Sequence, residues 1–95
     1  MDNIDTIDMV ISDLEDRIKS TDKSIALNEE GYEAAINEKN ELLKNNATPD
    51  KIEDVDKLIS TYKDIIENRK KHKEGYLKDL EEWKKLKEEQ ENGRH

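Results

Sequence analysis

The chain of 95 residues contains no cysteine, no phenylalanine and a single proline. The lack of cysteine excludes disulfide bonds, thiolate metal ligands and cysteine nucleophiles. Hydrophobic residues are also scarce, at 32% of the sequence, whereas charged residues make up 44% and give a formal net charge of −8. Chains of this composition lie close to the border at which too little apolar surface is buried to fold, so the spacing of the apolar residues decides the structure.

Long apolar runs are missing as well, since none exceeds three residues such as Met9–Ile11. The first residues are acidic, where a secretion signal would be basic. We therefore expect a cytoplasmic chain that does not enter a membrane. The abundance of asparagine, lysine, aspartate and isoleucine is typical of proteins encoded by AT-rich genomes, such as those of low-GC bacteria and their bacteriophages.

The apolar residues that are present recur in alternating steps of three and four. A first series runs from Ile4 to Leu42, and the same rhythm restarts at Ile52 and continues to Lys87. This is the heptad repeat of a coiled coil, with Ile4 and Ile52 at position a of their heptads. The sequence therefore predicts two amphipathic helices.

The break between the two series carries the signals of a helix start. Thr48 is a good N-cap, Pro49 fits the first helical position, and Asp50 suits the positive end of the helix dipole. Because the linker is short, the second helix should run antiparallel to the first. We predict an all-α antiparallel two-helix coiled-coil hairpin as a single domain over residues 1–95: helix at about 3–45, turn at 46–48, helix at about 49–91 and a frayed tail at 92–95.

Folding the chain at this turn sets a register in which small residues face large ones. Ala35 then lies opposite Tyr62, and Gly31 lies opposite Ile65. A glycine inside a helix is unfavourable, and the missing side chain of Gly31 makes room for Ile65. Gly75 falls on the outer face, where nothing explains it. The register also predicts ion pairs between flanking positions of the two helices: Glu15–Lys84, Glu29–Lys70 and Arg17–Asp79.

The predicted seam turns polar at mid-length. Asn28 faces Arg69 there, with His72 and Lys73 beside Ile25. A polar layer of this kind can fix the register of a coiled coil at some loss of stability. The alternative interpretation is a hinge or a binding site.

Several apolar residues are left over once the seam is filled. A two-helix pair covers one stripe per helix, so these residues require a further surface, either a second hairpin that completes a four-helix bundle or a partner protein. We therefore predict a homodimer or a complex with another protein, through the following residues: Leu58, Ile65, Leu77, Ile36, Leu43, Met9 and Leu27.

The acidic charge is concentrated in the first half of the chain, where 12 acidic residues oppose five basic ones. This balance disfavours direct nucleic-acid binding. It permits a different role, in which carboxylates imitate the phosphate backbone and block a basic nucleic-acid-binding protein. The residues of this acidic face are Asp2, Asp5, Asp8, Asp13 and Asp16.

Candidate catalytic residues are few. His72 is the only histidine away from the C-terminal end, and no second ligand type stands near it at metal spacing apart from Glu74 and Asp79. We expect no catalysis, cofactor or metal, and predict a non-enzymatic protein–protein interaction module: a small acidic adaptor, regulator or inhibitor. The alternatives are the acidic nucleic-acid mimic and a self-assembling scaffold component.

Overall fold

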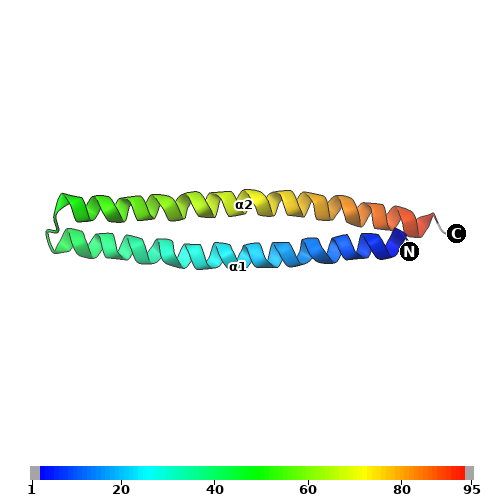
Figure 1. Ribbon diagram of the computed structural model, residues 1–95, viewed down its shortest axis with the longest axis horizontal. Helices are drawn as coiled ribbons and strands as arrows, with labels where there is room; N and C mark the ends of the chain where they lie inside the picture. The colour runs from blue at the N-terminus through cyan, green and yellow to red at the C-terminus, as the bar shows by residue number, and fades with distance from the viewer. Residues whose placement is uncertain (1–2, 94–95) are drawn as a thin grey trace. The chain divides into compact units, whose positions relative to one another are not determined.

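The predicted helical hairpin is confirmed by the computed structural model, which describes residues 3–93 (Figure 1). Helix α1 spans Asn3–Lys44 and helix α2 spans Pro49–Asn92. The two helices lie side by side and run antiparallel, and the described residues contain no strand. Both helices end within one residue of the predicted boundaries.

The turn between the helices is a Schellman motif. Asn46 adopts a left-handed conformation, with φ of 51°. Its N–H donates to the carbonyl of Leu43 at 3.3 Å, and the N–H of Ala47 donates to the carbonyl of Leu42 at 3.0 Å. These bonds satisfy carbonyls that the end of α1 would leave unpaired, and asparagine tolerates the left-handed region better than most residues.

Helix α2 begins as predicted, at Pro49. The carbonyl of Thr48 accepts hydrogen bonds from the N–H groups of Lys51 and Ile52, at 3.1 and 3.3 Å, as an N-cap carbonyl does. Proline at the first helical position has no N–H group to leave unpaired.

The hairpin divides into two compact units, each containing a stretch of both helices. The turn unit consists of Lys23–Lys70, and the terminal unit consists of the residues up to Asp22 and from Lys71. The division falls in the stretch where the predicted seam turns polar.

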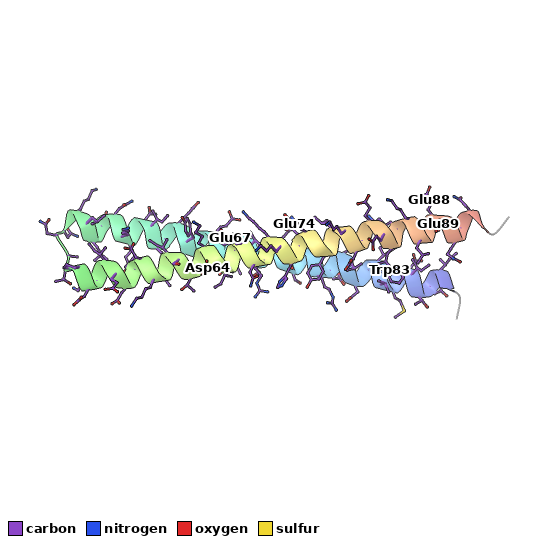
Figure 2. The ribbon with its side chains drawn as sticks, turned by 90° about the horizontal axis from the view of Figure 1, so that it is seen from above. Asp64, Glu67, Glu74, Trp83, Glu88 and Glu89 are labelled. Carbon is purple, nitrogen blue, oxygen red and sulfur yellow. The ribbon has the colours of Figure 1, made fainter. Side chains whose placement is uncertain are left out.

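Helix α1 supplies most of the buried core in both units. Ile7, Ile11 and Leu14 are buried in the terminal unit, and Ile25 and Ala35 are buried in the turn unit. The half-buried residues of α2 occupy the heptad positions that face them. In Figure 2, for example, Trp83 lies between the two helices, whereas Glu88 projects away from α1.

The heptad positions predicted from the sequence are buried or half-buried, with one exception. Every a and d residue from Ile4 to Leu42 in α1 is shielded, and so is each one from Ile52 to Lys87 in α2 except Arg69. Arg69 is exposed because a guanidinium placed in the seam without a carboxylate partner would lose its hydration. Among the described residues of α2, Val55 is the buried one.

Gly31 is required by the aromatic ring that covers it. A Cβ atom at Gly31 would lie 2.6 Å from Cε1 and Cζ of Tyr62, closer than any real contact. The register places Ile65 opposite this glycine, and the atoms nearest to the Cβ position of Gly31 belong to the Tyr62 ring. Gly75 has open space around its Cβ position.

The two glycines provide a matched pair of substitutions. We expect Gly75→Ala to stabilise the hairpin by roughly 1 kcal/mol, because alanine is the better helix former and meets no obstacle. We expect Gly31→Ala to lower the melting temperature, because displacement of the Tyr62 ring outweighs the same gain in helix propensity. Thermal unfolding followed by circular dichroism measures both.

A Tyr62→Ala background supplies the control. Without the ring, Gly31→Ala should become stabilising, as Gly75→Ala is. If Gly31→Ala raises the melting temperature of the wild-type chain as much as Gly75→Ala does, the ring does not depend on this glycine.

Candidate interaction surfaces

Among residues 3–93, three ion pairs join the helices, and all have the same form. A lysine at a seam position of one helix reaches sideways to an aspartate on the flank of the other, as long lysine side chains do. The nitrogen–oxygen distances are 2.6 to 2.8 Å, in Lys39–Asp56 of the turn unit and in Lys73–Asp22 and Lys87–Asp8 of the terminal unit. These pairs let half-buried lysines occupy the seam with their ammonium groups neutralised.

The ion pairs predicted between flanking positions are not formed among residues 3–93. Arg17 binds Asp13 within α1, at 2.9 Å, instead of Asp79. Glu15 and Lys84 lie on the rims of grooves, as do Glu29 and Lys70. The prediction failed because it paired residues on the flanks of the two helices. The lysines that reach the opposite helix lie at seam positions instead.

Within the polar layer at mid-length, the side chain of Asn28 finds its hydrogen-bond partner in α1 itself. Nδ2 of Asn28 donates to the carbonyl of Ser24 at 2.7 Å, and the hydroxyl of Thr21 donates to the carbonyl of Arg17 at 2.7 Å. Asn28 therefore makes no bond to Arg69 that would fix the register. The three lysine–aspartate pairs join the helices instead.

The acidic face is partly neutralised. Asp8 binds Lys87 and Asp13 binds Arg17, whereas Asp5 and Asp16 are exposed and form no ion pair with a described cation. Asp2 lies outside the described residues. The carboxylate of Asp13, together with the hydroxyl of Tyr76, raises the pKa of Arg17 above its usual value.

Most of the apolar residues predicted to bind a partner are exposed. Ile36 and Ile65 are half-buried. Leu86 is exposed too and is not among the residues predicted from the sequence. The exposed fractions are 64% for Met9, 67% for Leu27, 51% for Leu43, 42% for Leu58, 45% for Leu77 and 36% for Leu86.

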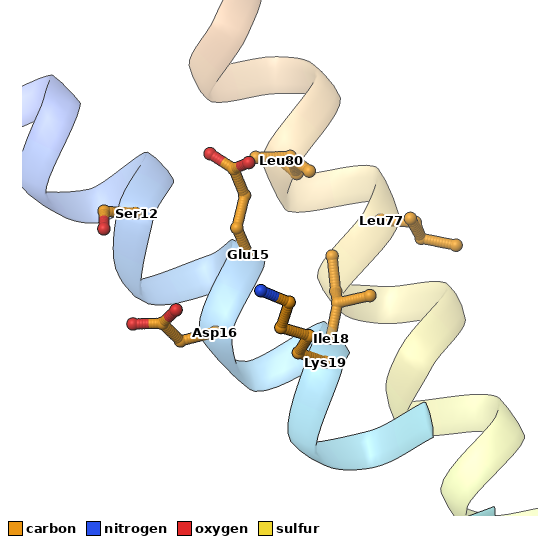
Figure 3. A pocket seen from close by; sticks show the side chains of 7 residues that line it. All are labelled: Ser12, Glu15, Asp16, Ile18, Lys19, Leu77 and Leu80. Carbon is orange, nitrogen blue, oxygen red and sulfur yellow. The ribbon is translucent and has the colours of Figure 1, made fainter. Parts of the chain in front are cut away.

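A shallow groove in the terminal unit includes one of these leucines (Figure 3). Ile18 and Leu80 are half-buried in its floor, Leu77 forms one side, and Glu15 and Asp16 belong to the acidic side contributed by α1. The groove is open to solvent along its length. It provides an apolar strip with an acidic border, without an enclosed pocket.

The turn unit has two unlike shoulders. One holds a groove with Tyr32 and Ile66 as its apolar floor and a charged rim of Glu29, Lys63, Glu67 and Lys70. The Lys39–Asp56 pair belongs to this shoulder as well. Charged groups therefore surround its apolar residues.

The other shoulder of the turn unit carries no charge over eight residues. Heptad positions g and c of both helices lie on this side, where the Tyr62 ring covers Gly31. We call this surface the uncharged face; it consists of Ser24, Leu27, Gly31 and Ala34 of α1 with Leu58, Thr61, Ile65 and Asn68 of α2. In a chain that is 44% charged, an uninterrupted patch of this size is unusual.

Within the described part of the chain, no group of three or more histidine, cysteine, aspartate or glutamate side chains converges as it would around a metal ion. His72 is exposed. Neither described helix combines the length and the apolar character needed to cross a bilayer.

Comparison with known proteins adds no information about function. No protein-family model matches the chain, and no curated protein or solved structure is significantly similar to it.

The Lys87–Asp8 pair predicts a pH dependence of stability. Hydrogen bonding and charge attraction from Asp8 raise the pKa of Lys87 above 10.5, with a smaller contribution from Glu91. Because the pKa is higher in the folded chain, the pair stabilises fully below the unfolded pKa and its contribution is lost as pH rises through the folded value. We expect Asp8→Asn to lower the melting temperature slightly at neutral pH and the difference from wild type to disappear at strongly alkaline pH.

The control for this titration is Asp5→Asn, which removes a carboxylate that binds no described cation. Its melting temperature should differ from wild type by an amount that does not change near the pKa of Lys87. A constant difference for Asp8→Asn across the alkaline range would show that the ion pair does not contribute to stability.

Proposed function

We propose that this chain is a non-enzymatic protein–protein interaction module, a small cytoplasmic adaptor, regulator or inhibitor that occupies the surface of a partner protein. The observation that carries the proposal is the set of exposed leucines beside the seam, above all Leu27 and Leu58 on the uncharged face. Apolar patches of this kind on a small chain are typical of interaction sites.

The accessible surface of the whole chain supports the same proposal. It amounts to 7305 Å². A folded monomeric protein of 11.1 kDa is expected to expose only about 5,700 Å². The excess of this one chain is about twice the area that a standard protein–protein interface buries on each partner, roughly 800 Å². Association would therefore bring the exposed surface closer to the usual level for this mass.

Imitation of nucleic acid by the acidic face has less support. Such a role needs carboxylates that are free to bind the basic groups of a partner. Two of the four described aspartates of that face, Asp8 and Asp13, already bind cations of this chain. The groove of the terminal unit adds apolar surface beside Asp16, which suits an apolar contact better than a nucleic-acid-like one.

Two sets of substitutions separate these functions. Partners would be isolated by pull-down from cells that express the chain and then measured by surface plasmon resonance. Leu58→Ser with Ile65→Ser should raise the dissociation rate and leave the salt dependence slight, because apolar contacts hold the complex. Exchange of all five acidic-face aspartates for asparagine should change mainly the association rate.

Circular dichroism establishes that each variant is still helical. Complete loss of binding in the five-asparagine variant, with its helicity intact, would favour the acidic mimic over the proposed module. Unchanged dissociation of Leu58→Ser with Ile65→Ser would place the contact elsewhere on the chain.

A further inference from the structure

We propose that the partner of the uncharged face is a second copy of this chain, packed face to face with the two turn units antiparallel across a two-fold axis near Ile65. This inference rests on the proposed function, because it names the occupant of a surface already assigned to protein contacts. Four helix segments would then enclose a common core, as in an antiparallel bundle.

The apolar side chains of the uncharged face are the first reason. Leu27 of α1 is 67% exposed and Leu58 of α2 is 42% exposed. Ile65 lies two helical turns from Leu58 on the same side of α2 and is half-buried. Removing each such side chain from water contributes about 1.5 kcal/mol or more.

The relief of the face allows a close approach. The Tyr62 ring lies in the space beside Gly31 where a side chain would stand. Ser24 and Ala34, on the same side of α1, are small. A helix of another molecule can therefore approach α1 closely at these two residues, while the exposed Leu27 projects between them.

The charges at the two ends of the face select a second copy and its direction. Toward the turn, the same rows of α1 and α2 continue with three exposed carboxylates and one exposed ammonium: Glu38, Glu41, Asp54 and Lys51. At the opposite end of the turn unit, Lys23 and Arg69 flank the face and are exposed.

An antiparallel copy places the acidic end of each face on the basic end of the other. A parallel copy would place acidic end on acidic end, which is unfavourable. The surface is thus complementary to itself in one direction only.

The size of the contact sets its strength. The face extends over about 20 Å along two helices that together are about 20 Å wide. Its flat area is then roughly 400 Å² per copy, about half of what a standard interface buries on each partner and in the range of weak, transient contacts. We therefore expect a dissociation constant in the micromolar range.

Sedimentation equilibrium of the full chain tests the association. The wild-type chain should pass from monomer to dimer as its concentration rises through the micromolar range. Leu58→Ser with Ile65→Ser should raise the dissociation constant at least about tenfold. The matched control is Ile36→Ser with Leu43→Ser, which removes one half-buried isoleucine and one exposed leucine from the opposite shoulder and should leave the dimer intact.

Leu27→Ser is a second variant that separates loss of the dimer from loss of folding, because Leu27 lies outside the seam. This substitution should weaken the dimer without lowering helicity. A wild-type chain that stays monomeric to millimolar concentration would overturn the inference. So would a dimer that both sets of serine substitutions affect equally.

A disulfide tests the direction. Ile65→Cys places a thiol next to the proposed two-fold axis, so the oxidised variant should form a covalent dimer with native helicity. Leu43→Cys, on the other shoulder, should not. In a parallel dimer Ile65 would face α1 of the second copy, so a dimer in which Ile65→Cys fails to crosslink would contradict the antiparallel arrangement.

These outcomes are distinct from failure of the proposed function. If the chain is monomeric and Leu58→Ser with Ile65→Ser still abolishes capture of another protein, the interaction module stands and the second copy is excluded. If Leu58→Ser with Ile65→Ser changes neither self-association nor the capture of another protein, the uncharged face has no role in binding.

Discussion

A pair of helices has only one seam in which to bury apolar side chains, and this limit governs the rest of the structure. No large side chain among residues 3–93 is fully buried, and α2 contributes only Val55 to the fully shielded core. The aromatic residues of α2 are half-buried. The hairpin is therefore stabilised by many half-buried contacts and by the lysine–aspartate pairs along its flank.

The seam could be predicted from the sequence because heptad spacing depends on helical geometry alone. The turn could be predicted because Thr48, Pro49 and Asp50 are local signals. The left-handed Asn46 was not foreseen, although asparagine just beyond a helix end is a recognised signal for it. Local geometry could thus be predicted wherever a residue type strongly favours one local structure.

Contacts across the seam were harder to predict. The ion pairs depend on how far each side chain extends sideways from its helix. A heptad diagram does not show this, because it places only the Cα atom of each residue. Lys73 therefore reaches Asp22 from the seam, although the diagram pairs flanks with flanks. For the same reason the diagram did not show that the Tyr62 ring lies against Gly31. The candidate partner-binding leucines were found because they lie off the seam, but the continuity of the uncharged face became visible only when both helices were placed together.

The central claim is that this face of the turn unit is where the molecule associates. Methyl-resolved NMR over a dilution series tests it most directly, because each leucine and isoleucine reports on its own surroundings. The account predicts that the methyl signals of Leu27, Leu58 and Ile65 shift with concentration while those of Leu77 and Leu43 stay constant. Signals that stay constant on the uncharged face, or shifts confined to Leu77 or Leu43, would contradict it.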